Sequence, residues 1–153
     1  MYEHIKFKNA INMRKANYDK FPSTKLTGML VQGWDSIISM LKKKMDARKV
    51  LAVDLYTGVY EEEVLGAFSK EFSGRVMNVR DLMKPEKEIQ ALTERFMTED
   101  VLFGYVTNLK LEDYLDVDKV AAARKQISEA KETIVIIGTG AAAVAPQDAM
   151  VVY

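Results

Sequence analysis

Apolar residues recur at helical spacing in four stretches of the chain. From Trp34 to Met45 they fall every three or four positions, and lysines at 42–44 stand near the end, where a helix dipole favours cations. The same period returns in three later stretches. The sequence therefore predicts helices over residues 34–45, 61–72 and 88–97, and a fourth that Asp116 or Asp118 caps and that runs through Ile127. We expect Gly74 to end the second helix.

Short apolar runs rich in β-branched residues lie between the predicted helices. The strongest covers residues 133–137, Thr-Ile-Val-Ile-Ile, and such a run is typical of a buried strand. Similar runs cover residues 49–55, 75–79 and 149–153. Strands that alternate with helices predict βαβ units with right-handed crossovers. We therefore predict an α/β fold with a mostly parallel sheet flanked by helices, in a three-layer α/β/α arrangement.

The first part of the chain differs from the rest. Residues 1–33 have no sustained period, and Pro22, Ser23 and Thr24 interrupt helix formation there. A chain of 153 residues falls in the size range of one ordinary domain. The sequence therefore predicts an extended N-terminal arm over residues 1–33 and one α/β domain over residues 34–153.

The composition argues against several functional classes. With 22 basic and 22 acidic side chains the chain has no net charge, which argues against nucleic-acid binding. There is no Cys and one histidine, His4, so a thiolate or histidine metal site and a serine-type triad have almost no material. No apolar run approaches about 20 residues and no signal peptide is recognised, so we expect no membrane contact and a cytoplasmic location. We expect no catalytic residue, metal or cofactor in this chain.

Two loops are the candidates for a binding site, because a parallel sheet binds ligands beyond the carboxyl ends of its strands. One follows the strand at 49–55, and the other follows the strand at 133–137. The candidate phosphate- or nucleotide-binding residues are Asp54, Tyr56, Thr57, Gly58, Val59, Gly138, Thr139 and Gly140.

The first loop resembles the P-loop pattern G-x-x-x-x-G-K-[ST] without its lysine. In that pattern backbone N–H groups wrap a phosphate, the lysine neutralises it and the hydroxyl holds magnesium. With Gly58 as the second glycine, Val59 and Tyr60 stand where Lys and Ser/Thr belong, and glutamates follow at 61–63. Their charge would repel a polyphosphate from the helix N-terminus. A plain strand-to-helix turn, with acids in its first helical turn, is the simpler interpretation.

The other signals also have simpler interpretations. Gly138-Thr139-Gly140 can serve close packing as well as phosphate approach. Asp54 is a candidate magnesium ligand or base, but a cap of the turn that follows it is the simpler role, because no His or Lys partner is evident. The aromatic side chains Tyr18, Phe21 and Trp34 form either a docking patch or part of the packed interior.

Five stretches carry a family resemblance: residues 17–24 (NYDKFPST), 32–34 (QGW), 54–59 (DLYTGV), 136–141 (IIGTGA) and 151–153 (VVY). From about Asn17 onward the chain resembles the N-terminal part of long mannose-6-phosphate isomerase-like proteins of Bacteroides-type bacteria. That part is similar to a degenerate uridine kinase or phosphoribulokinase domain. The resemblance implies a P-loop NTPase-like, nucleoside kinase-like fold.

The resemblance also implies a partner. In such proteins a zinc-dependent cupin domain further along carries out the aldose–ketose isomerisation, and no residues here match its histidine and glutamate ligands. Zinc would belong to that isomerase domain, which would be the partner of this chain, with self-association as the alternative. The domain over residues 34–153 would be incomplete at its C-terminus, and its last strand would leave an edge open to pairing.

Three functions remain open from the sequence. The leading hypothesis is a non-catalytic, degenerate kinase-like domain that binds a phosphorylated sugar or nucleotide, or docks on the isomerase. The alternative is an active small-molecule kinase with an atypical P-loop, in which Lys49 or Lys84 replaces the missing lysine and Asp54 is the base or magnesium ligand. The third is a purely structural docking domain, with Trp34 and the tyrosines packed against the isomerase.

Overall fold

The computed structural model describes residues 21–25, 27–100 and 102–153. The chain divides between Leu30 and Val31 into two units. In the first unit, residues 21–25 and 27–30 form no helix or strand. His4 and Tyr18, which the sequence analysis singles out, lie outside the described residues. The helices and strands described below belong to the second unit.

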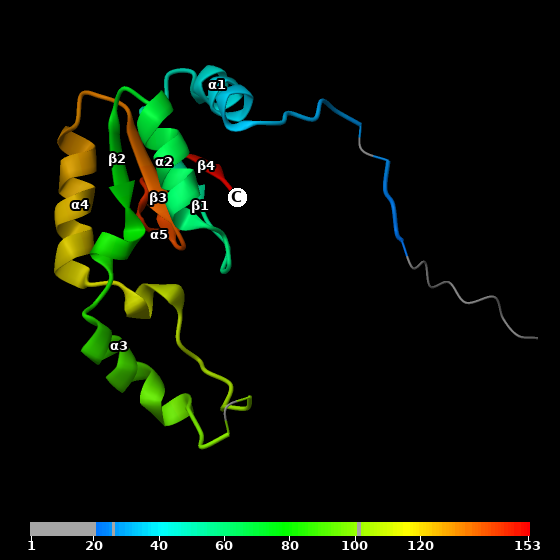
Figure 1. Cartoon of the computed structure of the whole chain (residues 1–153). Helices are drawn as coiled ribbons and strands as arrows, with labels where there is room; N and C mark the ends of the chain where they lie inside the picture. The colour runs from blue at the N-terminus through cyan, green and yellow to red at the C-terminus, as the bar shows by residue number, and fades with distance from the viewer. Residues whose placement is uncertain (1–20, 26, 101) are drawn as a thin grey trace, which may run out of the picture. The chain divides into compact units, whose positions relative to one another are not determined.

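The second unit is an α/β fold in which helices and strands alternate along the chain (Figure 1). Its strands are β1 (Val50–Asp54), β2 (Arg75–Asn78), β3 (Ile134–Gly138) and β4 (Met150–Val152). Its α-helices are α1 (Trp34–Met45), α2 (Glu61–Glu71), α3 (Glu86–Thr93), α4 (Val117–Glu129) and α5 (Ala141–Val144). The strands and α1, α2 and α4 lie where the apolar spacing predicts them. Within the described ranges, no helix is both long and apolar enough to cross a membrane.

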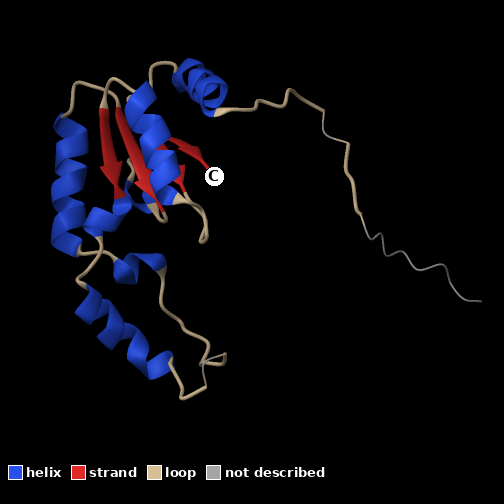
Figure 2. Ribbon diagram, viewed as in Figure 1, coloured by secondary structure: helices blue, strands red, loops and turns tan. Residues whose placement is uncertain are grey.

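The four strands form one parallel sheet in the order β2-β3-β1-β4 (Figure 2). The central pair is β1 and β3, in register from Val50 opposite Ile134 to Asp54 opposite Gly138. All of β3 and the first four residues of β1 are buried, which explains their continuous apolar sequence. The expectation of a mostly parallel sheet flanked by helices is confirmed.

The sheet divides its side chains between two apolar clusters, one on each face. One cluster joins alternate residues of β1 and β3 to α4 and α5, and the other joins the residues between them to α1 and α2. In β1, Val50 and Ala52 belong to the first cluster, and Leu51 and Val53 to the second. Because neighbouring residues of a strand point to opposite faces, one buried strand supports both helical layers.

The C-terminal end of α2 differs from the prediction. Its C-cap is Phe72, which is extended (φ −93°, ψ 130°) and whose N–H donates to the carbonyl of Phe68 at 2.9 Å. Gly74 lies beyond this cap, where an added Cβ would lie 1.9 Å from the carbonyl oxygen of Thr133. The prediction that Gly74 ends the helix is wrong. Glycine is needed there because the backbones at Gly74 and Thr133 approach too closely for a side chain.

α4 begins with a side-chain cap. The Asp116 carboxylate accepts hydrogen bonds from the backbone N–H groups of Asp118 and Lys119, both at 3.0 Å. These N–H groups belong to the first helical turn and have no partner inside the helix. Of the two caps that the sequence predicts, Asp116 is the one that forms.

The chain leaves the sheet between the 3₁₀ helix Val79–Leu82 and α4, and we call residues 84–116 the excursion. Its base is closed where Met83 pairs antiparallel with Leu115 and where Asp116 N donates to Leu82 O at 2.9 Å. The predicted helix at 88–97 is instead α3, which begins directly after Pro85 and is continued by the 3₁₀ helix Glu94–Phe96. α3 has no buried residue and extends beyond the carboxyl ends of the strands (Figure 1).

Two glycine substitutions separate helix propensity from backbone crowding. In α2, a Cβ added to Gly66 meets no atom within 4 Å, so Gly66→Ala is expected to stabilise the fold by about 0.5–1 kcal/mol. Gly74→Ala is expected to destabilise it by about 2 kcal/mol, because the backbone at Thr133 must move. Urea unfolding of both variants measures the difference, and equal unfolding midpoints would contradict this account of Gly74.

Candidate functional site

A cavity of about 490 Å³ lies beyond the carboxyl ends of the central strands. It is lined by residues 55–62, which are the loop after β1 and the start of α2, by Arg80 after β2 and by Thr139 after β3. The predicted site residues that line it are Tyr56, Thr57, Gly58, Val59 and Thr139. The other three predicted residues, Asp54, Gly138 and Gly140, lie behind it and have different contacts.

The loop after β1 turns at Gly58 and holds two tyrosines outward. Gly58 has a φ of 95°, a backbone conformation that residues with side chains rarely adopt. The N–H of Val59 donates to the carbonyl of Tyr56 at 3.2 Å, which closes the turn. Tyr56 and Tyr60 are 84% and 82% exposed. The cavity therefore has aromatic surface at its mouth.

The first turn of α2 borders this cavity, because Glu61 and Glu62 belong to its lining. Its N-cap is Tyr60, whose side chain makes no capping hydrogen bond. The first N–H groups of a helix have no partner inside the helix, and the N-terminus carries partial positive charge. This end of α2 can therefore receive an anion.

Two of the three glutamates in that turn are occupied by donors. Glu61 accepts a hydrogen bond from Nδ2 of Asn78 at 2.7 Å and lies 3.5 Å from Nε of Arg80. Glu63 accepts from the indole N–H of Trp34 at 3.1 Å. Glu62 lines the cavity and is exposed. From the sequence we expect the three carboxylates to repel a polyphosphate together. In the structure, Glu61 and Glu63 instead make specific contacts with donors of the protein.

Arg80 is a site residue that sequence reasoning missed. It belongs to the 3₁₀ helix after β2, and its N–H donates to Oδ1 of Asn78 at 2.8 Å, which fixes the turn. Its side chain is 63% exposed, and the contact with Glu61 holds it at the cavity. The available signal was topological, because β2 is parallel to β1 and its carboxyl end opens on the same edge of the sheet.

Asp54 caps a turn, but a different one from the turn predicted. Its Oδ1 accepts from the N–H of Gly140 at 2.9 Å, and its Oδ2 accepts from the N–H of Ala142 at 3.0 Å. Both partners lie in the loop after β3, 86 and 88 residues away in sequence. The interpretation of Asp54 as a cap of the turn that follows it is therefore wrong, since the carboxylate ties the end of β1 to the start of α5.

The glycines of the second loop are needed for close packing. A Cβ added to Gly138, whose φ is 135°, would lie 2.9 Å from Cβ of Val79. One added to Gly140, whose φ is 90°, would lie 2.8 Å from Cδ2 of Leu111. The N–H of Gly140 already donates to Asp54. This loop contributes Thr139 to the cavity, and its glycines serve the packing behind it.

Neither lysine considered for a kinase lies at the cavity. Lys49 precedes β1, and that strand's five residues, at about 3.3 Å each, separate it from the carboxyl edge. Nζ of Lys84 donates to the carbonyl of Asp113 at 2.6 Å, inside the excursion. Arg80 is the one cation among the described residues that line the cavity.

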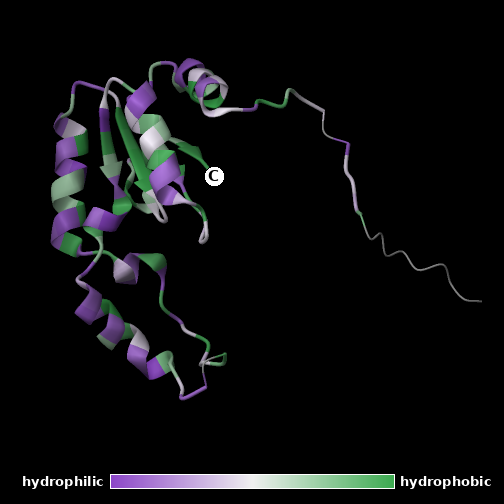
Figure 3. Ribbon diagram, viewed as in Figure 1, coloured by the Kyte–Doolittle hydropathy of each residue, from purple (hydrophilic) through white to green (hydrophobic). Residues whose placement is uncertain are grey.

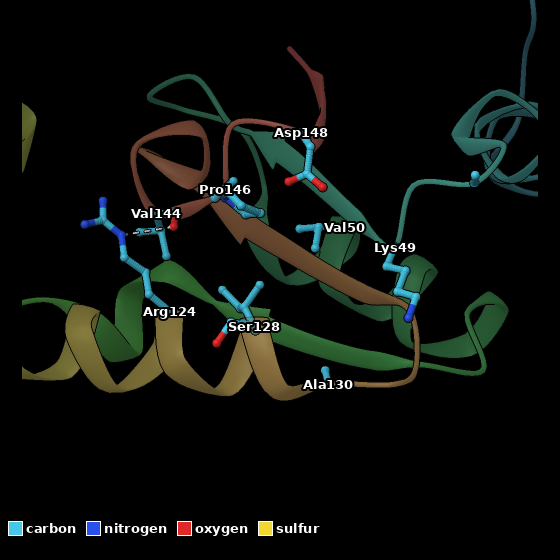
Figure 4. A pocket seen from close by; sticks show the side chains of 11 residues that line it. Lys49, Val50, Arg124, Ser128, Ala130, Val144, Pro146 and Asp148 are labelled. Carbon is cyan, nitrogen blue, oxygen red and sulfur yellow. Dashed lines mark hydrogen bonds between the residues drawn. The ribbon is translucent and has the colours of Figure 1, made fainter.

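A second cavity, of about 530 Å³, opens at the amino ends of β1 and β4 (Figure 4). Val50 and Val144 belong to its apolar walls, and Lys49, Arg124 and Asp148 are the charged residues of its lining (Figure 4). Arg124, also in the lining, donates from Nη2 to the carbonyl of Ala143 at 2.7 Å. α5 has only four residues and therefore covers little of the sheet face on which α4 packs. The space that this short helix leaves beside α4 is the cavity.

Trp34 is used inside the fold. Its ring meets Phe68 edge-on, with 6.4 Å between the centroids, and its N–H donates to Glu63. It packs against the cluster formed by α1, α2 and one face of the sheet. Packing therefore accounts for Trp34, while Phe21 is 79% exposed.

The carboxylates of the described ranges do not gather into a metal site. No group of three or more His, Asp or Glu residues lies close enough there to hold an ion. Asp54, the sequence candidate for magnesium, uses both oxygens for backbone N–H groups.

Residues 33–153 match the family described as Domain of unknown function (DUF8485). The chain belongs to this family. No curated protein and no solved structure matches the chain. The DUF8485 match covers every helix and strand from α1 to β4, and with them both cavities.

The Asp54 contacts predict a measurable stability effect. Asp54→Ala removes both carboxylate acceptors and is expected to destabilise the domain by about 2 kcal/mol, because hydrogen bonds to charged groups contribute about that much. Asp54→Asn keeps one acceptor oxygen and is expected to cost about half as much. Asp148→Ala, at an exposed aspartate, is the control and is expected to change stability by less than about 0.5 kcal/mol. Guanidinium unfolding measures all three, and an unchanged midpoint for Asp54→Ala would contradict the structural role.

Proposed function

We propose that this DUF8485 domain is a non-catalytic, P-loop-kinase-like domain that binds a phosphorylated sugar or nucleotide and works beside a mannose-6-phosphate isomerase. The observation that carries the proposal is the cavity at the carboxyl edge, which joins Arg80 to the first turn of α2. A P-loop also follows a strand and opens a helix, as the loop between β1 and α2 does. In this proposal the isomerase is the partner, zinc belongs to that partner, and both work in the cytoplasm.

The groups around the cavity match a single phosphate. A guanidinium presents several N–H donors in a fork that suits phosphate oxygens, and Nε of Arg80 lies 3.5 Å from Glu61. The first N–H groups of α2 add uncapped donors. Thr57 and Thr139 are hydroxyl-bearing residues in the lining, and Tyr56 and Tyr60 provide aromatic surface for a sugar or base.

The same groups favour a monophosphate over a triphosphate. Arg80 and the N-terminus of α2 share the cavity with an exposed carboxylate, Glu62, and no lysine is among the described residues that line it. A magnesium triphosphate needs a lysine and a hydroxyl where this loop has Val59 and Tyr60. Weak binding of a phosphomonoester follows, with a Kd on the order of 1 mM, or about 4 kcal/mol.

The same region also supports the non-catalytic part of the proposal. Phosphoryl transfer depends on positively charged groups that neutralise the transferred phosphate and on a residue that orients the nucleophile. Lys49 and Lys84 lie away from the cavity, and Asp54 is engaged with Gly140 and Ala142. The geometry therefore favours binding over the alternative of an active kinase.

Arg80 provides the direct test of the binding proposal. Calorimetric titration of the full chain with mannose 6-phosphate, uridine monophosphate and inorganic phosphate is expected to show saturable binding of at least one. Arg80→Ala is expected to weaken that binding by about tenfold or more, because it removes a charged hydrogen-bond donor. Arg95→Ala is the matched control, since Arg95 lies over the Phe96 ring in the excursion and outside the cavity. Failure of all three ligands to bind would overturn the proposal.

A variant at Glu62 removes negative charge from the cavity, whereas the Arg80 variant removes positive charge. Glu62→Gln removes an exposed carboxylate from the lining and is expected to tighten binding of the same ligand by about threefold at low salt. Glu132→Gln, at an exposed glutamate outside the lining, is expected to leave the Kd unchanged. Magnesium-dependent ATP turnover that Asp54→Ala abolishes would instead support the kinase alternative.

A further inference from the structure

The loop after α3 holds apolar side chains in solvent although hydrogen bonds fix its backbone. The N–H of Tyr105 donates to the carbonyl of Phe96 at 2.8 Å, and the N–H of Leu102 donates to Oδ1 of Asp100 at 2.8 Å. A Cβ added to Gly104 would lie 2.6 Å from that Phe96 carbonyl, so glycine permits the close approach. The exposure of this loop is therefore compatible with a fixed fold of its backbone.

Five large apolar side chains of this loop are exposed within ten positions of sequence. They are Met97, Leu102, Phe103, Tyr105 and Val106, and each is at least 69% exposed. The first four of them, with Phe96 and Tyr114, line a cavity of about 470 Å³. Figure 3 shows hydrophobic segments along this loop, beyond the carboxyl ends of the strands. Clustered apolar exposure of this kind marks an interaction site. We call the five exposed residues Met97, Leu102, Phe103, Tyr105 and Val106 the docking surface.

The docking surface has an acidic surround. The excursion contains eight acidic and four basic residues, in a chain whose total charge is zero. Asp100 lines the 470 Å³ cavity, and the exposed residues Glu94, Glu99 and Asp113 each follow or precede a lining residue in sequence. The four basic residues, Lys84, Lys87, Arg95 and Lys110, against eight acidic ones leave the excursion with a net charge of −4, and the guanidinium of Arg95 lies 4.7 Å from the Phe96 ring centroid. A partner must therefore bring positive charge as well as apolar side chains.

We propose that the docking surface binds a lysine- or arginine-rich peptide segment of a partner protein, with apolar side chains that enter the 470 Å³ cavity. The acidic surround disfavours the other occupants. Two copies that met through this same surface would place like charges opposite each other. An anionic membrane would be repelled for the same reason. This inference does not depend on phosphate binding at the carboxyl edge.

The probe is a fluorescent peptide whose leucines recur every three or four positions among lysines, so that it forms an amphipathic helix, and its counterpart carries glutamates in place of the lysines. The lysine peptide is expected to bind the full chain with a Kd that rises with salt, and the glutamate peptide is expected not to bind. Phe103→Ser is expected to weaken binding by about tenfold, because buried aromatic anchors dominate such interfaces. Tyr153→Ser removes an aromatic side chain that is 96% exposed elsewhere and is expected to change nothing.

A charge reversal completes the test. Glu99→Lys is expected to weaken binding of the lysine peptide about threefold at low salt and hardly at all at high salt, whereas Glu132→Lys has no effect. Far-UV circular dichroism checks that every variant is folded. Equal binding of both peptides, or a lysine-peptide Kd that Phe103→Ser leaves unchanged, would overturn the proposal. A concentration-dependent dimer that Phe103→Ser abolishes would also overturn it, because a second copy would then be the occupant.

Discussion

The carboxylate of Asp54 joins the ends of the two central strands, and the whole carboxyl edge is arranged around this contact. β1 and β3 run in register to Asp54 and Gly138, and beyond that point the two loops must separate. The two hydrogen bonds from Gly140 and Ala142 draw the second loop back onto β1, and Leu55 N adds a bond to Gly138 O at 3.3 Å. Thr139 is thereby left beside the loop after β1, where the cavity forms. An internal carboxylate thus takes backbone donors that a glycine turn could otherwise offer to a ligand.

The cavity and the excursion lie at the same end of the sheet (Figure 1). Leu111 of the excursion packs on Gly140, whose N–H is held by Asp54. The cavity and the excursion differ in the charged groups that they expose. At the cavity, Glu61 contacts Arg80 and Glu63 accepts from Trp34, so two of the three carboxylates in the first turn of α2 are engaged. The excursion carries an excess of exposed acids around apolar side chains and therefore suits a cation.

Sequence patterns predicted the strands and the sheet-covering helices because each has a local cause. The β-branched run at 133–137 is buried throughout as β3, and Asp116 caps α4 as its position before an apolar period indicates. The candidate site was predicted less completely because its contacts are distant in sequence. The partners of Asp54 lie 86 and 88 residues away, and Arg80 enters the cavity only because β2 is parallel to β1. Gly74 was misassigned because its neighbour Thr133 is far along the chain.

The proposed anion site lies between the loop after β1 and Arg80. Two-dimensional ¹H–¹⁵N spectra of the labelled chain, recorded during titrations with mannose 6-phosphate, uridine monophosphate and inorganic phosphate, test it most directly because they locate the ligand. We expect saturable shifts of the Thr57, Gly58 and Thr139 amides and of the Arg80 Nε–H, with the amides around Phe103 unchanged. Shifts confined to the cavity around Lys49 and Asp148, or no shifts at all, would contradict it.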